Sequence, residues 1–295
     1  MKIIHVGKNN EIKTINEAIK ASIGPTYIYL DDPLYFEKVV IDKEDIILDG
    51  QNNATIEYND YAEKIHEDGR QYVTFRTYTL LIKAKNVYLK NLKILNSAGE
   101  GANIGQAVAL HLYNDNIVVE NCKIIAKQDT LFCGPLSRDL IERYVDLLPL
   151  DEREYKNEFH QYFLNCYIEG TVDFIFGGAS AVFYNSKIVS GKTSRTCYIA
   201  APNHEKTNNF GFKFINCKIY SKNHQKENTY LARPWRDFGF VSFIDCSLSN
   251  NIKKEGFSIW ENTNRHENAR FYEINSKGKG AKNNKQNRPK WTIVL

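Results

Sequence analysis

The chain has 295 residues and a formal net charge of +4, with 42% hydrophobic and 25% charged residues. This composition is typical of a globular protein with a substantial core, and the scattered Lys and Arg residues lack the basic concentration of nucleic-acid or membrane binders. Aromatic residues reach 13%, with 18 Tyr and 16 Phe but 1 Met, and this bias toward strand-forming residues predicts an all-β protein. We expect a single domain over residues 1–295.

The N-terminal residues contain no apolar run of the length that a secretory signal needs, and no later segment approaches 18 consecutive apolar residues. The expectation is therefore a cytoplasmic protein, with secretion through an unseen leader as the alternative. Residues 14–21 have helical apolar spacing, with Thr14 as N-cap and Glu17 at the capping-box position. They predict a helix that caps the N-terminal end of the fold.

A short pattern recurs through the middle of the chain: a polar residue, a small or apolar residue, an exposed residue and an apolar residue. Its copies begin at Asn91, Asn121, Asn165, Asn185, Asn216 and Asp245. The steps between these copies are 30, 44, 20, 31 and 29 residues, within the range of solenoid coils whose loops vary in length. The pattern predicts a right-handed parallel β-helix, in which equivalent residues of successive coils stack.

The second position of the repeat is Cys in several copies, namely Cys122, Cys166, Cys217 and Cys246. We interpret this row as small apolar side chains stacked in a narrow core, and without an export signal we expect the thiols to stay reduced. No His or Cys spacing of the zinc kind occurs, so we expect no metal site. The recurring Asn is expected at a turn, where it can hydrogen-bond to the coils above and below.

The 44-residue step contains a charged insertion, residues 137–160. Its apolar residues Leu140, Ile141 and Leu147 are spaced partly as in a short amphipathic helix. The insertion can form a wall or lid beside a site, or a solvated loop, and the sequence leaves both readings open. Near the C-terminus, residues 276–290 are rich in Lys, Asn and Gly and predict an exposed tail, after which residues 291–295 return to the fold.

Polar groups that are costly to bury stand among apolar residues in four short segments. These groups are Gln106, Gln128, Asp129, Asp173 and Arg233, with Trp235 beside the last of them. Without the insertion, Asp129 and Asp173 are about one coil apart, and stacked coils are separated by about 4.8 Å. Two carboxylates this close do not readily both ionise, so we expect one to keep its proton while Arg233 holds the other as an anion.

The two amides favour a catalytic site over a simple ion-pair cluster. Gln106 and Gln128 are poor partners for a salt bridge but good donors to an oxyanion that forms on an attacked carbonyl. If the strand is regular, Asp173 and Ile175 share one of its faces, while Phe174 and Phe176 share the other.

These segments, together with residues 34–39 and 74–79, resemble the pectin methylesterase (pectinesterase) family of carbohydrate esterases, and the match spans nearly the whole chain. Members of that family are right-handed parallel β-helices that hydrolyse the methyl esters of galacturonate units in pectin without a metal or cofactor. The resemblance implies that Asp173 is the nucleophile and that Asp129 is first the general acid and then the base. It also implies that Gln128 and Gln106 stabilise the oxyanion and that Arg233 keeps Asp173 ionised. The residues implied at the sugar subsites are Trp235, Phe176, Val172 and Thr74.

The chain departs from the family pattern at two points. Ala232 stands where the last motif usually has Gly, and an insertion like residues 137–160 occurs only in some members, but neither change removes a catalytic group. The implied partner is an acidic polysaccharide or oligosaccharide, a methylated galacturonan, bound by a monomer, with no nucleic acid and no membrane. Because no export signal is present, the expected substrate is an imported methylated oligogalacturonide in an intracellular bacterial enzyme.

Three other readings of the same scaffold remain open. A pectate lyase would need a cluster of acidic calcium ligands, and a polygalacturonase-like hydrolase would need a carboxylate pair without paired amides. A non-catalytic glycan-binding β-helix would need aromatic residues but not Asp129, Asp173 and Arg233 together. The two glutamines argue against the lyase and the hydrolase.

Overall fold

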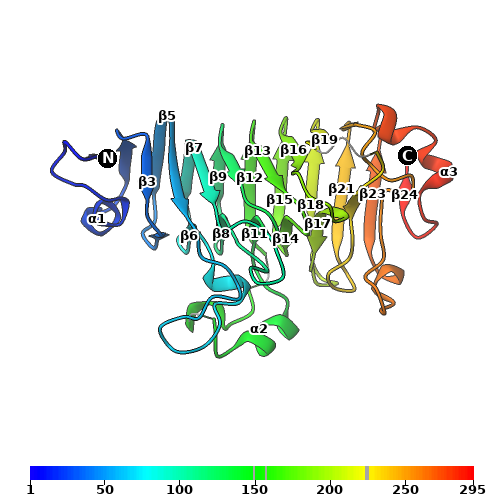
Figure 1. Cartoon of the computed structure of the whole chain (residues 1–295), viewed down its shortest axis with the longest axis horizontal. Coiled ribbons are helices and arrows are strands. Elements are labelled where there is room, and N and C mark those ends of the chain that lie inside the picture. Colours follow the sequence, from blue (N-terminus) through cyan, green and yellow to red (C-terminus); the bar gives the residue numbers. More distant parts are fainter. Residues whose placement is uncertain (149, 157, 223–225) are drawn as a thin grey trace.

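The structure is a computed structural model that describes residues 1–148, 150–156, 158–222 and 226–295. Parallel strands stack coil upon coil along the long axis, and the two chain ends lie at opposite ends of the stack (Figure 1). This arrangement confirms the all-β class and the parallel β-helix.

The strands form two sheets that run the length of the stack. The larger sheet contains β1 (Lys2–Val6), β2 (Thr26–Leu30), β3 (Leu34–Phe36), β5 (Ile46–Tyr58), β7 (Val87–Asn96), β9 (Ile117–Glu120), β10 (Lys123–Ile125), β12 (His160–Leu164), β13 (Tyr167–Gly170), β15 (Ser180–Tyr184), β16 (Lys187–Ser190), β18 (Phe212–Ile215), β19 (Lys218–Ser221), β21 (Phe240–Ile244), β22 (Ser247–Leu248), β23 (Arg270–Ile274) and β24 (Ile293–Val294). The smaller sheet contains β4 (Val39–Ile41), β6 (Leu80–Ile82), β8 (Leu110–Leu112), β11 (Leu131–Cys133), β14 (Ile175–Gly177), β17 (Cys197–Pro202) and β20 (Thr229–Ala232).

The short helices lie outside the sheets. They are α1 (Ile15–Ala21), α2 (Arg138–Tyr144) and α3 (Asn284–Asn287), with 3₁₀ turns η1 (Thr74–Arg76), η2 (Leu150–Glu152), η3 (Arg265–Glu267) and η4 (Lys279–Ala281). Among the described residues, none of these helices is long and apolar enough to cross a membrane.

The strand register confirms the repeat and its irregular steps. The third position of each copy pairs with its equivalent in the next coil, in the order Lys93, Lys123, Tyr167, Lys187, Lys218 and Ser247. The first position adopts the left-handed conformation, with φ near +50° at Asn165, Asn185 and Asn216, which Asn and Asp tolerate better than most residues. Nδ2 of Asn185 donates to Oδ1 of Asn165 at 2.6 Å, so the predicted hydrogen bond between coils is present.

Aromatic side chains form a continuous row inside the solenoid, and Cys side chains form a second row in which Ser186 stands between Cys166 and Cys217. The rings of Phe163, Phe183, Phe214 and Phe243 stack with centroids 4.5, 4.5 and 4.7 Å apart and planes within 10° of parallel. The predicted row of reduced thiols is confirmed, because all six Cys residues are buried and free.

Truncation of a ring in the middle of this stack is expected to destabilise the whole solenoid. Phe214→Ala should lower the free energy of unfolding by about 3–5 kcal/mol, because the solenoid relaxes only partly around a cavity flanked by two fixed rings. Urea unfolding followed by circular dichroism measures this. Tyr184→Ala is the matched control: its ring is 48% exposed, and its loss should change stability by no more than about 0.5 kcal/mol. A loss below about 1 kcal/mol for Phe214→Ala would contradict the stacking argument.

The N-terminal cap agrees with the prediction. Helix α1 begins after Thr14, whose hydroxyl accepts from the backbone N of Glu17, while the Glu17 carboxylate accepts from the backbone N of Thr14. This reciprocal capping box starts the helix, and the buried Ile15, Ala18 and Ile19 face the first coils.

The C-terminal segment corrects one prediction. Residues 276–290 are not a plain exposed tail, because they contain η4 and α3 and the segment is anchored by the buried Arg288. Its Nε lies 2.7 Å from Oε2 of Glu273 in β23. The polar composition of this segment favoured a solvated tail. The buried ion pair that anchors it could not be predicted, because an ion pair produces no periodic pattern in the sequence. The predicted return of residues 291–295 is confirmed by the pairing of β24 with β23.

Two excursions leave the solenoid on the same side, below β6 to β14 in the view of Figure 1. One is the predicted insertion 137–160, which contains α2 and η2; its residues 149 and 157 lie outside the described residues. The other, residues 59–77, was not predicted. Arg76 Nε donates to the carbonyl of Leu147 at 3.4 Å, and Arg70 Nη1 donates to that of Asp146 at 3.5 Å. These bonds join the two excursions beside the smaller sheet.

Candidate active site

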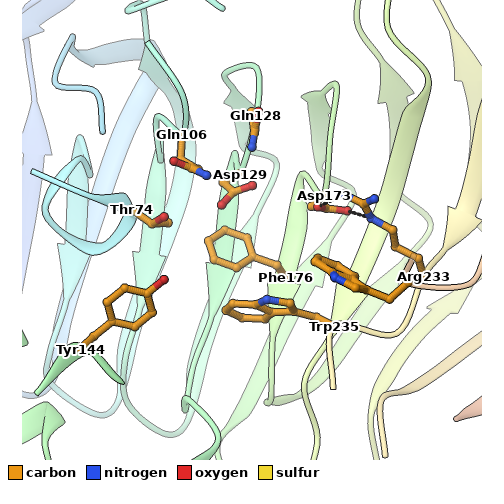
Figure 2. Close-up of a pocket in the computed structure, with 11 residues that line it drawn as sticks. Thr74, Gln106, Gln128, Asp129, Tyr144, Asp173, Phe176, Arg233 and Trp235 are labelled. Carbon is orange, nitrogen blue, oxygen red and sulfur yellow. Dashed lines mark hydrogen bonds and ion pairs between the residues drawn. The ribbon is translucent and has the colours of Figure 1, made fainter. Parts of the chain in front are cut away.

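A cleft with a cavity volume of about 220 Å³ lies along the smaller sheet, at the side that carries the excursions. Its lining residues are Thr74, Gln106, Gln128, Asp129, Tyr144, Asp173, Phe176, Ala201, Arg233, Trp235 and Trp260. Every polar group singled out in the sequence therefore lies in one cleft (Figure 2).

The two carboxylates occupy equivalent positions in neighbouring coils. Asp129 and Asp173 each lie two residues before a strand of the smaller sheet, and Leu131 pairs with Ile175 in the next coil. Both have left-handed backbones, with φ of +61° and +49°. The backbone N of Asp129 donates to the carbonyl of Val172 at 3.0 Å, so the chain turns into each strand in the same way. The 44-residue step thus amounts to one coil plus the insertion, as predicted.

The left-handed turn corrects the expected alternation of faces. Because β14 begins only at Ile175, Asp173 is not part of the regular strand, and it lines the cleft together with Phe176 and not with Ile175. Gly177 follows with φ of +128°, and an added Cβ there would lie 2.1 Å from the carbonyl oxygen of Cys133. The strand therefore ends where only glycine fits.

Arg233 binds Asp173 in a bidentate pair. Its Nε donates to Oδ1 at 2.8 Å and its Nη2 to Oδ2 at 2.5 Å. The guanidinium lies between two rings, 3.9 Å from the centroid of Tyr198 and 4.4 Å from that of Trp260. Cation–π contacts on both faces and the planar fork fix the guanidinium, so the Asp173 carboxylate is held in one orientation.

Asp129 carries no such ion pair in the described structure and has the opposite electrostatic character. Removal from water raises its pKa well above the usual range for Asp, and the negative charge of Asp173 adds to this rise. Arg233 and Arg195 oppose the rise but do not cancel it. The cleft therefore holds one carboxylate paired with a cation beside a second that favours its protonated form, a combination suited to nucleophilic and acid–base work.

In Figure 2, Gln106 lies on the opposite side of Asp129 from Asp173, and Gln128 lies above Asp129. Figure 2 shows the side-chain nitrogens of Gln106 and Gln128 directed toward the space above Asp129. Gln106 precedes β8, and its carbonyl accepts from the backbone N of Ala62, which ties the 59–77 excursion to the cleft. Oε1 of Gln128 accepts from Nη1 of Arg195 at 3.1 Å.

Aromatic side chains lie below the two aspartates in Figure 2, and Thr74 lies at the left of the cleft. The rings of Trp235 and Phe176 meet edge to face, with centroids 5.8 Å apart, and Thr74 lies at the start of η1. Val172 is the exception among the predicted subsite residues: it is 4% exposed and does not line the cleft. The family resemblance implied Val172 at a sugar subsite, but its side chain is not among those that line the cleft.

Several residues that line the cleft, or that contact its lining as Arg195 and Tyr198 do, were not singled out in the sequence. Tyr144 comes from α2, so the insertion forms a wall of the cleft, which favours the first of its two readings. Trp260 and Arg195 come from loops outside the repeat. The position of Tyr198 could have been predicted from the repeat. Ala200 pairs with Ile175, so Tyr198 occupies in the next coil the position that Asp173 occupies in its own coil.

The donor set of the cleft does not resemble a metal centre. In residues 1–148, 150–156, 158–222 and 226–295, no group of three or more His, Cys, Asp or Glu side chains is placed to hold an ion.

Comparison with known proteins gives a consistent family. The family model "Pectinesterase" matches residues 3–139 and 143–294. Among curated proteins, Pectinesterase 4 of Arabidopsis thaliana is 28% identical over 303 residues, covering 97% of this chain and 46% of its own length. The chain thus spans about half the length of the first curated relatives it matches.

Solved structures of similar fold include several pectin methylesterases. The Aspergillus niger enzyme has a TM-score of 0.78 at 25% identity, covering 99% of this chain and 90% of its own. The carrot enzyme has a TM-score of 0.80 at 23% identity, covering 100% and 88%. A pectin methylesterase solved in complex with a hexasaccharide has a TM-score of 0.78 at 22% identity, covering 100% and 92%. The expected bacterial source finds no support, because the first curated relatives are plant proteins.

Proposed function

The chain belongs to the pectinesterase family, and we propose that it hydrolyses the methyl esters of galacturonate units in pectin or in methylated oligogalacturonides, releasing methanol. One observation carries this proposal: the bidentate Arg233–Asp173 pair faces Asp129 and two glutamine amides within a single cleft. An ester hydrolase needs a nucleophile, a proton donor and an oxyanion site, and this cleft offers a candidate for each.

In the first half of the reaction, a carboxylate oxygen of Asp173 attacks the ester carbonyl carbon. The carbonyl oxygen becomes an oxyanion, to which the amides of Gln106 and Gln128 donate. Protonated Asp129 gives its proton to the departing methoxy oxygen, so the C–O bond breaks and methanol leaves. An acyl-enzyme anhydride between Asp173 and the galacturonate remains.

In the second half, the Asp129 carboxylate takes a proton from water while the water oxygen attacks the anhydride. The bond to Asp173 breaks, the acid product leaves, and both aspartates return to their starting states. Arg233 supports both halves because it stabilises Asp173 as an anion, both as an attacking and as a leaving group.

Substrate binding is assigned to the wall of the cleft. Trp235, with its ring against Phe176, offers an apolar face to a pyranose, and Tyr144 closes the cleft from the insertion. Binding of a hexasaccharide by the structurally similar esterase supports an oligosaccharide-sized ligand. We place methylated galacturonan in this cleft, with Thr74 at the left side of the cleft in Figure 2.

The proposal predicts methanol from methyl-esterified substrate and no cleavage of the sugar chain. Purified protein should be incubated with highly methylated pectin and with methylated trimers to hexamers, and methanol, reducing ends and unsaturated uronate should be measured together. Methanol alone is the expected result. Reducing ends without methanol would indicate a polygalacturonase-like enzyme, and unsaturated uronate a lyase. Binding without any product would indicate a glycan-binding module.

The same experiment addresses the expected cytoplasmic setting, which stays a prediction. Faster turnover of trimers to hexamers than of polymer would favour an enzyme that acts on imported fragments. Faster turnover of polymer would favour action outside the cell.

A further inference from the structure

We propose that Arg195 is a positioning residue that fixes the orientation of the Gln128 side-chain amide for catalysis. Arg195 lies in the loop between β16 and β17, and its Nη1 donates to Oε1 of Gln128 at 3.1 Å. The inference rests on the proposed function, because it concerns the donor that Gln128 offers to the oxyanion.

The argument begins with the hydrogen-bonding chemistry of the two groups. A guanidinium has only donors, whereas a glutamine amide has an accepting oxygen on one side and a donating nitrogen on the other. Arg195 can therefore face only Oε1, which leaves Nε2 directed into the cleft above Asp129 (Figure 2). If the Gln128 amide were flipped, its Nε2 donor would face the Nη1 donor of Arg195. Its Oε1 would then face the oxyanion in the cleft, which it would repel.

The loop that carries Arg195 is tied to the turn between β10 and β11, which carries Gln128. Nζ of Lys127 donates to the carbonyl of Lys192 at 3.0 Å, next to the Arg195–Gln128 contact. Within the loop, the backbone N of Arg195 donates to Oγ1 of Thr193 at 3.1 Å. Two side-chain hydrogen bonds thus join residues 127–128 to residues 192–195. The Gln128 amide is therefore bound to an arginine whose own loop is held in place.

Gln106 provides the internal comparison. Among the described residues, no hydrogen bond is recorded for its side chain, so Arg195 supports only one of the two amides. Loss of Arg195 should therefore act through Gln128 and leave the contribution of Gln106 intact. Loss of one oxyanion donor costs about 10²–10³ in kcat, and a merely disordered donor should cost less.

The test is a set of double-mutant cycles on kcat and KM for methanol release from a methylated hexagalacturonate. Arg195→Met should lower kcat about tenfold and change KM less than about twofold, because the lost interaction serves the transition state. Arg195→Lys, which keeps a donor, should recover most of kcat. Lys192→Met removes a neighbouring charge from the same loop and should leave kcat unchanged.

The cycles separate positioning from other roles. Because Arg195 also lowers the pKa of Asp129, kcat is compared at the pH optimum of each variant. In a Gln128→Ala background, Arg195→Met should have no further effect on this kcat, whereas in a Gln106→Ala background it should keep its full effect. Equal effects in both backgrounds would overturn the inference, since Arg195 would then act directly on substrate or on Asp129. A raised KM with unchanged kcat would also overturn it and would identify a substrate-binding arginine.

The outcomes distinguish this inference from the function on which it rests. If the folded wild-type protein releases methanol but Arg195→Met matches it, only the inference fails. If the folded wild type releases none, the proposed function fails and the inference fails with it. Thermal unfolding of each variant confirms the fold, and little change is expected because Arg195 is exposed.

Discussion

Asp173→Asn is expected to lower methanol release by about 10⁴-fold or more. An amide cannot attack the ester carbonyl, so the covalent route is lost and only binding and oxyanion stabilisation remain. The substitution preserves the side-chain volume and leaves one oxygen to accept from Arg233, but its amide nitrogen faces the second Arg233 donor. Thermal unfolding should therefore accompany the assay to show that the variant is folded. Steady-state assays at high enzyme concentration measure the residual rate.

A matched control separates loss of the nucleophile from loss of a buried ion pair. Asp49 is also buried and lies 3.3 Å from a cation, Nζ of Lys90, but it belongs to β5, in the larger sheet away from the cleft. Asp49→Asn should lower stability by about 1–3 kcal/mol and leave kcat within about twofold of wild type. More than 1% residual activity in folded Asp173→Asn would rule out its role as nucleophile.

Asp129→Asn is the second large prediction, with an expected loss of about 10²–10⁴ in kcat. Asparagine can neither protonate the methoxy group nor take a proton from water. Because the pKa of Asp129 is raised, the wild-type rate should fall as pH rises through that pKa, where the proton donor is lost. Rate profiles from pH 4 to 9 should show this fall in the wild type and its absence in the residual activity of the variant.

Asp129→Asn should lower activity but raise the free energy of unfolding relative to wild type at high pH. A carboxyl whose pKa is higher in the folded than in the unfolded protein binds more protons when folded, so its contribution to stability falls as pH rises above the unfolded value of about 3.9. Asp129→Asn removes this dependence. Urea unfolding at pH 5 and pH 8 should show the variant gaining stability over wild type at the higher pH. An equal pH dependence in both proteins would contradict the raised pKa.

The periodic features of this fold could be predicted from sequence because they repeat. Each coil restates the same constraint, so the spacing of Asn121, Asn165 and Asn185 was enough to set the register. The capping box at Thr14 and Glu17 could also be predicted, because it depends only on residues close together in the sequence. The proximity of Asp129 and Asp173 could be predicted from the same repeat, because about one coil separates them when the residues of the insertion are left out.

The remaining features depend on contacts between segments that do not repeat. Tyr144, Trp260 and Arg195 reach the cleft from the insertion and from loops, and no periodicity relates their positions to the coils. The left-handed turn at Asp173 broke the strand alternation and buried Val172. The 59–77 excursion lacks helical or strand periodicity, because it is held by bonds such as that from Arg76 to the insertion.

Joint measurement of methanol and acid release from a methylated hexagalacturonate tests the central claim most directly. Methanol is quantified enzymatically while a pH-stat records protons, with wild type and Asp173→Asn run side by side. The account predicts equal amounts of methanol and acid from wild type, and neither from the variant above background. Absence of methanol from folded wild type, or equal rates from the two proteins, would contradict it.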